Sequence, residues 1–250
     1  MNNKTQRHNL ILRELRKKQE VGYTALSALI GVSEDTIRRD IKELVDKGLL
    51  TKVKGGASVK TVLPISYQGR ERYGTPQKEI VGDKARTIFR SGMTVIFDGG
   101  TTPFMAAASL PHDIRLTVIT HSFPVANLFL QAESVKTIFI GGTISTNSQI
   151  TTGIKVYEEY ARLHADICVL GVHSLHVEDG VSDPIAEEAM VKTMMCQVAD
   201  KAVAVATSDK LGRRSTHRVC ETTEIDALVT ELSPDDPLIQ SFVNKGVTVI

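Results

Sequence analysis

The 250-residue sequence is poor in cysteine and has no long hydrophobic run. Its three cysteines form no Cys-x-x-Cys pair, which argues against a disulfide framework or a zinc ribbon and fits a reducing cytoplasm. No stretch approaches the ~18 uncharged apolar residues of a membrane span, and the polar N-terminus lacks the apolar segment of a signal peptide. We therefore expect a cytoplasmic protein with no membrane partner. The composition, 42% hydrophobic and 24% charged, excludes collagen and low-complexity disorder.

The net charge of +1 hides two parts of opposite sign. Residues 1–60 contain 13 lysines and arginines against seven aspartates and glutamates, an excess of six positive charges. Residues 61–250 contain 17 against 22, an excess of five negative charges. A basic segment on an acidic body indicates that the first part meets an anionic polymer, whereas the second part does not.

The hydrophobic pattern also changes near residue 60. Before it, apolar residues recur at helical spacing, and after it short apolar runs alternate with amphipathic helical stretches. This alternation predicts a mostly parallel sheet covered on both faces, an α/β fold. The sequence therefore predicts one domain at 1–60, a linker at 61–77, where no clean period exists, and a larger domain at 78–250. The predicted strands lie at 94–97, 116–119, 137–140, 167–170 and 202–205.

The first 60 residues predict three helices followed by a hairpin. Gly31 ends the second helix and Ser33 is a candidate N-cap for the third. The three-residue turn between these helices has the length found in a helix-turn-helix. Alternating apolar and lysine residues around Gly55-Gly56 predict a two-stranded wing. The predicted helices lie at 5–18, 23–30 and 33–47, and the hairpin lies at 49–60.

The third predicted helix has one apolar and one basic face. At ~100° per residue, its isoleucines and leucine share one stripe, and two arginines and a lysine lie on the other side. Arginine can pair with the O6 and N7 of guanine or bind phosphate, as in a helix that reads the major groove. The alternative is a small protein-interaction module whose charges are only solvated. The candidate DNA-binding residues are Tyr23, Thr24, Ser33, Asp35, Thr36, Arg38, Arg39, Lys42, Lys52 and Lys54.

Polar or glycine-rich turns follow three of the predicted strands in the larger domain. The turn at 98–102 lies between a strand and a helix, where backbone N–H groups can bind an anion. Similar turns occur at 120–122 and 141–142. Loops at the carboxyl ends of parallel strands form the ligand sites of open α/β sheets. The candidate ligand-binding residues are Asp98, Gly99, Gly100, Thr101, Thr102, Thr120, His121, Ser122, Gly141, Gly142, Glu188, Lys192 and Lys210.

Several of these motifs resemble the DeoR family of bacterial transcriptional regulators. The run from Val32 to Ala57, with T-I-R-R-D and a closing G-G-A, resembles the DNA-binding signature of that family. D-G-G-T-T at 98–102, E-E-A-M-V-K at 187–192 and S-D-K-L-G at 208–212 resemble its sensor-domain motifs. The resemblance covers nearly the whole chain. It implies an N-terminal winged helix-turn-helix joined to a mostly parallel α/β sensor domain similar to ribose-5-phosphate isomerase and CoA-transferase folds.

The resemblance also implies a function. It implies a repressor that binds double-stranded operator DNA at a carbohydrate catabolic operon. A phosphorylated sugar or related metabolite would relieve this repression. Residues 99–102 would hold the phosphate, and Asp98, Glu188, Lys192 and Lys210 would line the sugar end. Because winged-helix readers usually bind repeated sites, we expect a homo-oligomer, either a dimer or a tetramer.

The chain departs from the family pattern at four positions in or near the implied pocket. These departures favour a variant sugar phosphate or an effector with fewer anionic groups. The four positions are His121, His173, Asp183 and Thr207.

An enzyme is the competing class of function. His121, His173 and His176 suggest a metal site or a general base, but loop histidines without i,i+4 spacing are more often hydrogen-bonded, so we predict no metal and no cofactor. An isomerase acting on a sugar phosphate needs a carboxylate base and an electrophile. The base could be Asp98, Glu187 or Glu188, and the electrophile could be Lys192 or Lys210. The complete set of DNA-binding elements predicted in residues 1–60 favours a sensor without catalysis instead.

Overall fold

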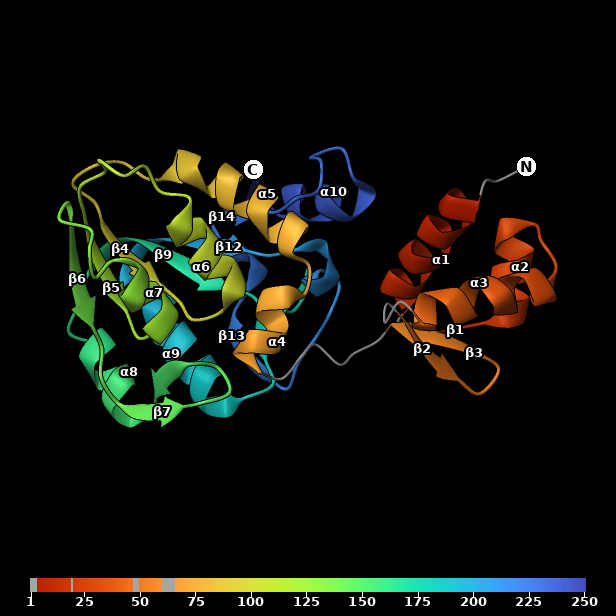
Figure 1. The fold of residues 1–250 in the computed structure, drawn as a ribbon, viewed down its shortest axis with the longest axis horizontal. Helices are drawn as coiled ribbons and strands as arrows, with labels where there is room; N and C mark the ends of the chain where they lie inside the picture. The colour runs from red at the N-terminus through yellow and green to blue at the C-terminus, as the bar shows by residue number, and fades with distance from the viewer. Residues whose placement is uncertain (1–3, 19, 47–49, 60–65) are drawn as a thin grey trace. The chain divides into compact units, whose positions relative to one another are not determined.

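The computed structural model shows two compact units, residues 1–63 and 64–250. Figure 1 draws the first in red and orange and the second in orange to blue. Each unit encloses its own buried apolar core. Within the ranges that the structure describes, no helix is both long and apolar enough to cross a membrane. The described residues are 4–18, 20–46, 50–59 and 66–250.

The first unit is a winged helix-turn-helix. The three predicted helices and the hairpin are confirmed, although residues 47–49 and 60 lie outside the described residues. One strand was not predicted: β1 pairs with β3, placing Val21 opposite Ala57. Three residues between two helices are too few to show a period. The elements are α1 (Lys4–Lys18), β1 (Glu20–Gly22), α2 (Tyr23–Ile30), α3 (Glu34–Asp46), β2 (Leu50–Val53) and β3 (Gly56–Val59).

Two small residues set the turn between α2 and α3. Gly31 has a φ of 75°, in the left-handed region that favours glycine, and its N–H donates to the Ser27 carbonyl at 2.9 Å. The Ser33 hydroxyl accepts a hydrogen bond from the Thr36 N–H at 3.3 Å. The predicted stop and N-cap are both confirmed, and together they fix where the basic helix begins.

A seven-stranded parallel sheet forms the centre of the second unit, in the order β15-β14-β12-β9-β4-β5-β6. From β4 the chain adds β5 and then β6, which forms one edge of the sheet. It then returns to place β9 on the other side of β4, and β12, β14 and β15 follow outward to the opposite edge. The strand order therefore reverses between β4 and β9, the place where open α/β sheets bind ligands. The strands are β4 (Thr94–Phe97), β5 (Leu116–Thr120), β6 (Val135–Phe139), β9 (Ala165–Gly171), β12 (Ala199–Val205), β14 (Ala227–Val229) and β15 (Thr248–Val249).

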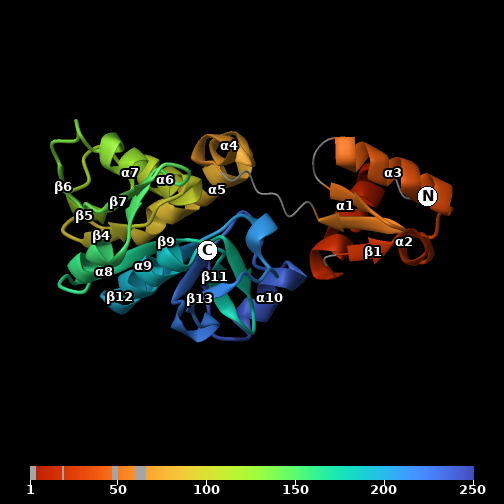
Figure 2. The ribbon, with the colours of Figure 1, turned by 90° about the horizontal axis from the view of Figure 1, so that it is seen from below.

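Helices cover both faces of this sheet. Val95 and Phe97 of β4 pack in the core beneath α5, α6 and α7, whereas Ile96 packs in the core beneath α8, α9 and α10. Figure 2 shows the sheet between the two helical layers. Burial on both faces explains the nearly continuous apolar strands. The helices are α5 (Thr75–Ala85), α6 (Thr101–Ala108), α7 (Phe123–Leu128), α8 (Ile154–Tyr160), α9 (Ala186–Gln197) and α10 (Pro237–Val243).

Two small antiparallel sheets lie beside the main sheet. β7 and β8 form a hairpin, and a bridge between Ser122 and Ile150 holds it at the carboxyl end of β5. β11 lies between β10 and β13 in the other sheet. The remaining elements are β7 (Thr143–Ser145), β8 (Ile150–Thr152), β10 (Ser174–His176), β11 (Gly180–Asp183), β13 (His217–Cys220), η1 (Arg86–Ile88), η2 (Ser208–Lys210) and η3 (Thr222–Glu224).

The stretch predicted as a linker, 61–77, contains one helix, α4 (Tyr67–Arg72), that the sequence did not predict, and the start of α5, where Pro76 was expected to open a helix. Residues 61–65 lie outside the described residues. Tyr67 is buried and its N–H donates to the Asn147 carbonyl at 2.7 Å, so α4 packs on the second unit. A six-residue helix is too short to give a periodic signal.

Candidate DNA-binding surface and effector site

The basic face of α3 is exposed, as predicted. Ile37, Ile41 and Leu44 are buried, whereas Arg38 and Arg39 point to solvent. Each arginine pairs with an acidic residue one turn earlier: Arg38 with Glu34 at 3.3 Å and Arg39 with Asp35 at 2.6 Å. These exposed pairs cost little to break, so either guanidinium can exchange its carboxylate for a phosphate or a base edge.

The other predicted DNA-binding residues have different environments. Tyr23 is buried at 4% exposure, and the Arg38 guanidinium lies 4.3 Å from its ring centroid, so the two side chains form a cation–π contact. The Thr24 hydroxyl donates to Glu34 at 2.6 Å. Ser33 and Thr36 share a 2.9 Å hydrogen bond at the start of α3. The side chains that remain open to solvent include those of Thr24, Ser33, Asp35, Lys42, Lys52 and Lys54.

Asp40 is a buried carboxylate that the sequence analysis did not single out. Its side chain accepts hydrogen bonds from Arg7 at 2.8 and 3.0 Å and lies 3.2 Å from His8 Nε2. Burial raises the pKa of Asp40, but Arg7 and His8 outweigh burial and hold it below its ordinary value. Asp40 therefore ties α3 to α1. The aspartate in T-I-R-R-D was the available signal, because it falls on the apolar side of the helix.

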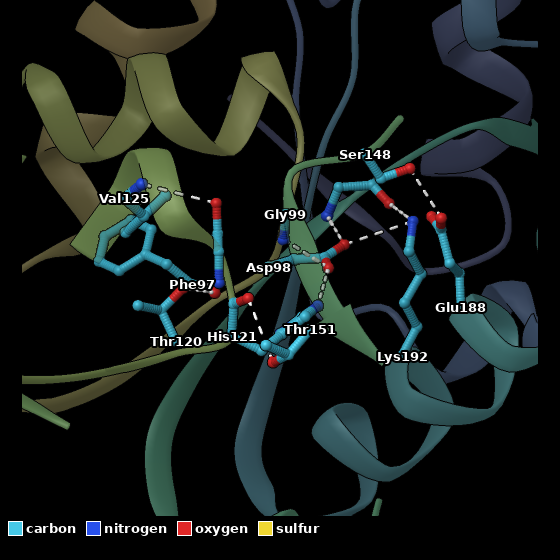
Figure 3. Close-up of polar contacts among 12 residues, drawn as sticks. Phe97, Asp98, Gly99, Thr120, His121, Val125, Ser148, Thr151, Glu188 and Lys192 are labelled. Carbon is cyan, nitrogen blue, oxygen red and sulfur yellow. Dashed lines mark hydrogen bonds and ion pairs between the residues drawn. The ribbon is translucent and has the colours of Figure 1, made fainter. Parts of the chain in front are cut away.

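Asp98 stands where the strand order reverses. Its carboxylate is 1% exposed and accepts hydrogen bonds from the N–H of Gly99 at 2.7 Å and of Gly171 at 2.9 Å, at the ends of β4 and β9 (Figure 3). A Cβ on Gly171 would lie 2.9 Å from Asp98 Oδ2 and 2.7 Å from the Gly99 carbonyl oxygen. Glycine is therefore required at 171, since the carboxylate fills the space that a side chain would take.

Lys192 on α9 pairs with this carboxylate and with a second one. Its Nζ lies 3.4 Å from Asp98 Oδ2 and 3.0 Å from Asp183 Oδ2, and it donates to the Gly171 carbonyl at 2.9 Å. Burial alone would lower the pKa of Lys192, but Asp98, Asp183 and Glu188 raise it above its ordinary value. The ammonium thus stays charged and holds α9, β11 and the ends of β4 and β9 together.

Glu188 lies one turn before Lys192 on α9. It accepts a hydrogen bond from the Ser148 hydroxyl at 2.7 Å, from the loop between β7 and β8 (Figure 3). Burial is the main reason that its pKa is raised, although Lys192 and Ser148 oppose this effect. Glu188 and Lys192 therefore belong to one buried cluster with Asp98 and Asp183, which we call the acidic cluster.

His121 borders the acidic cluster as a neutral residue. Its Nδ1 lies 2.9 Å from the Tyr160 hydroxyl, and its Nε2 lies 3.7 Å from Asp98 Oδ1. Burial, with a smaller contribution from the charge of Lys192, lowers the pKa of His121 to about 3. The histidine that departs from the family pattern therefore forms a buried pair with Tyr160 of α8.

His173 is the other histidine that departs from the family pattern. Its Nδ1 is within hydrogen-bond distance of the hydroxyls of Ser174, at 3.1 Å, and Ser215, at 3.2 Å.

The predicted glycine and threonine turns have mixed roles. Gly100 has a φ of 110° and caps α6, and Thr101 and Thr102 are buried in its first turn. The Thr120 hydroxyl donates to the Phe97 carbonyl, and Ser122 caps α7, so both support the backbone. Gly141 and Gly142 are exposed where the β7–β8 hairpin begins. The structure thus brings Asp98, Gly99, His121, Glu188 and Lys192 together.

Lys210 belongs to a different group of side chains. It lies 3.1 Å from Asp209, and it is close enough to Arg70 and Arg213 for their charges to lower its pKa, although burial is the larger cause. Lys78 of α5 is also buried, and its burial, with a smaller contribution from the charge of Lys210, lowers its pKa to about 8. Three members of this group were not predicted from the sequence, because they lie in the predicted linker, in the α5 helix that follows it and after η2. We call Arg70, Lys78, Lys210 and Arg213 the cationic cluster.

Comparisons with known proteins give the family. A model described as the DeoR-like helix-turn-helix domain matches residues 7–62, and one described as the DeoR C terminal sensor domain matches residues 74–232. The HTH-type transcriptional regulator GlpR of Haloferax volcanii is 34% identical over 90% of this chain and 89% of its own. The Glycerol-3-phosphate regulon repressor of Escherichia coli K12 is 27% identical over 97% of each chain. A solved ribose 5-phosphate isomerase A from Methanocaldococcus jannaschii is 16% identical with a TM-score of 0.40, over 54% of this chain and 53% of its own.

These matches agree in order with the two units of the structure. The helix-turn-helix model falls on the unit that carries the basic helix α3, and the sensor model falls on the unit that carries the acidic and cationic clusters. The resemblance read from the sequence motifs is therefore confirmed. The chain belongs to the DeoR family of transcriptional regulators.

Proposed function

We propose that this DeoR-family regulator is a sequence-specific repressor of a carbohydrate catabolic operon, with its operator affinity set by a phosphorylated sugar or related metabolite. The observation that carries the proposal is that the two units have different kinds of surface and interior. The first exposes Arg38, Arg39 and Lys42 on the face of α3 opposite its buried apolar residues. The second buries charged side chains of both signs. A relative named for the glycerol-3-phosphate regulon supports a phosphorylated effector.

The effector site is assigned to the carboxyl edge of the sheet. In this assignment the turn at 99–102, Glu188 and Lys210 contact the ligand. The polar atoms of three other residues, Asp98, His121 and Lys192, already have hydrogen-bond or ion-pair partners within the protein. Their role is therefore to hold the contacting residues in place. The regulator would act in the cytoplasm as a dimer or tetramer on repeated half-sites.

A sensor without catalysis fits this geometry better than an isomerase. A general base must be free to accept a proton from substrate, but Asp98 is 1% exposed and accepts two backbone hydrogen bonds beside the Lys192 ammonium. His121 is buried and neutral. Asp183 is buried and paired with Lys192, so Glu188 is the more accessible carboxylate of the cluster. Incubation with sugar phosphates in deuterated water would test it, since exchange of a carbon-bound proton would contradict a sensor-only role.

The DNA-binding assignment predicts the effect of removing one arginine. Arg38→Ala should lower operator affinity by about 1–3 kcal/mol and relax base preference, because a guanidinium that pairs with guanine is lost. Arg39→Ala, if it contacts phosphate alone, should weaken all sequences equally and reduce the salt dependence. Fluorescence anisotropy with operator and scrambled duplexes at several salt concentrations measures both effects. Arg13→Ala, an exposed charge on α1, is the control; unchanged affinity in both α3 variants would refute the assignment.

The effector assignment predicts a variant that no longer responds to the metabolite. A sugar phosphate that binds the native state should raise the Tm of the wild-type chain and release operator DNA. Thr101→Ala should keep operator affinity but lose release, because the buried hydroxyl in the first turn of α6 no longer contacts the ligand. Thr143→Ala, exposed on β7, should respond normally. If Thr101→Ala lost DNA binding instead, the residue would support the fold and not the ligand.

A further inference from the structure

Three consecutive residues between β7 and β8 connect separate parts of the second unit. The Tyr67 N–H of α4 donates to the Asn147 carbonyl at 2.7 Å, and the Ser148 hydroxyl donates to Glu188 of α9 at 2.7 Å (Figure 3). We call residues 147–149 the linking turn. It joins a carboxylate of the assigned effector site to α4, the first described element after residues 60–65.

Gln149 holds the linking turn in a disfavoured conformation. Its φ is 53°, and it is the one non-glycine residue in the described ranges with a positive φ. A side chain in this left-handed region is unfavourable and persists only where neighbouring contacts fix it. One such contact is the hydrogen bond from the Phe123 N–H to the Gln149 carbonyl at 3.0 Å. The linking turn is therefore strained, and it depends on its contacts to stay in place.

The residue that follows the linking turn packs against the turn at 99–102. A Cβ on Gly99 would lie 2.4 Å from Ile150 Cγ2, so the Ile150 side chain fills the space beside Gly99. A ligand that contacts both the turn at 99–102 and Glu188 therefore has the linking turn as a neighbour.

The hydrogen bond between Ser148 and Glu188 is the contact of the linking turn that a ligand can replace. Ser148 is 6% exposed, whereas Glu188 is half-buried. Burial raises the pKa of Glu188, and Lys192 and the Ser148 hydroxyl oppose this effect. A ligand hydroxyl donates to a carboxylate as a serine hydroxyl does, so exchanging the two changes little at Glu188. The strain at Gln149 then favours the exchange, because a released turn can leave the left-handed conformation.

We propose that the hydrogen bond between Ser148 and Glu188 is a conformational switch: a ligand hydroxyl takes Glu188, Ser148 is released, and the linking turn loosens its hold on α4. This inference rests on the function proposed above, in which Glu188 contacts the effector. It places a hydroxyl group of the effector at Glu188, and it makes Ser148 a positioning residue.

Helix α4 is suited to respond because it is short and held at both ends. Six residues are too few for a helix to be stable alone. Asn147 binds its amino end through the N–H of Tyr67, and Lys78 of α5 donates to two carbonyl oxygens at its carboxyl end. Loss of the first contact weakens the end of α4 that follows residues 60–65, while Lys78 keeps the other end in place.

Amide exchange on the full chain without ligand tests the switch. Ser148→Ala should speed exchange of the α4 amides by about tenfold, because a hydrogen bond to a charged group is lost. Ser148→Thr keeps the hydroxyl and should exchange as wild type does. Thr146→Ala, which removes an exposed hydroxyl just before the linking turn, is the matched control. The amides of β4 and β9 should exchange equally in all four proteins.

Two results of this experiment would overturn the inference. One is an α4 that exchanges at the same rate in Ser148→Ala and in wild type. The other is faster exchange throughout the second unit, β4 and β9 included, since Ser148 would then support the whole unit and not α4.

Operator binding supplies a readout that a purely structural role of Ser148 would not change. Ser148→Ala should imitate the ligand-bound state, so without ligand it should bind operator DNA about fivefold more weakly than wild type or Ser148→Thr. Glycerol 3-phosphate and ribose 5-phosphate are the probes of release. A probe that releases operator DNA from wild type should speed α4 exchange in wild type and add little in Ser148→Ala.

The outcomes separate this inference from the proposed function. If a probe releases operator DNA from wild type without any change in α4 exchange, the switch is overturned and the proposed function stands. If neither probe nor any other sugar phosphate releases wild type, but Ser148→Ala still loosens α4 and binds operator DNA more weakly, the proposed effector class is wrong and the link from Ser148 to α4 is supported.

Discussion

Lys192→Met will destabilise the second unit by about 3–5 kcal/mol, because it leaves two buried carboxylates without their cation. Asp98 and Asp183 lie 3.4 and 3.0 Å from Lys192 Nζ, and the methionine also removes the hydrogen bond to the Gly171 carbonyl. Asp98 keeps its two backbone donors, but they do not supply a full positive charge. The loss should be seen as a lower urea midpoint and faster amide exchange in β4, β9 and α9.

The control and the pH dependence distinguish charge from packing. Lys155→Met, an exposed lysine on α8, should leave the urea midpoint nearly unchanged. The folded-state pKa of Asp183 is lowered by Lys192, so this carboxylate stabilises the native state above its unfolded pKa and loses that effect as the pH falls. Lys192→Met should therefore lose less stability than wild type on acidification. A variant as stable as Lys155→Met would show that the cluster contributes little to folding.

Five strands of the main sheet, β4, β5, β6, β9 and β12, could be predicted from the sequence, because apolar runs are local signals, whereas β14, β15 and the two small antiparallel sheets were not predicted. Asp98 was placed correctly at the end of β4, but its partners could not be. Gly171 and Lys192 are 73 and 94 residues away, and they meet Asp98 only because β9 lies beside β4 in the sheet. Strand order depends on long-range packing, which a single sequence does not encode as a local pattern.

The same reason explains which side chains were missed. Arg70 lies in a stretch that reads as linker, and its helix α4 becomes stable only by packing Tyr67 into the second unit. His121 was a candidate ligand contact or base, but contact with Tyr160, 39 residues later, makes it a neutral structural residue. In the first unit most of the information is local, so the turn at Gly31 and the basic face of α3 were both predicted correctly.

Asp40→Asn will weaken the first unit and, with it, operator binding. Asp40 accepts hydrogen bonds from two nitrogens of Arg7 and one contact from His8, and thereby fixes α3 against α1. We expect the free energy of unfolding of the first unit to fall by about 2 kcal/mol. This is less than for a fully buried ion pair, because Arg7 keeps contact with water. A unit of about 60 residues has a small core and little stability to lose, so operator affinity should fall although Asp40 does not face the DNA.

Hydrogen exchange on the full chain separates this effect from the loss of a DNA contact. Asp40→Asn should speed amide exchange in α1 and α3 without changing the second unit, whereas Arg38→Ala should lower operator affinity with exchange unchanged. Asp46→Asn, an exposed aspartate on the same helix, should behave like wild type. Since the folded-state pKa of Asp40 is lowered, its contribution is present at neutral pH and is lost on acidification, so the wild-type and Asp40→Asn proteins should converge in stability as the pH falls. Equal protection of α1 in both proteins at pH 7 would show that the ion pair does not hold the recognition helix in place.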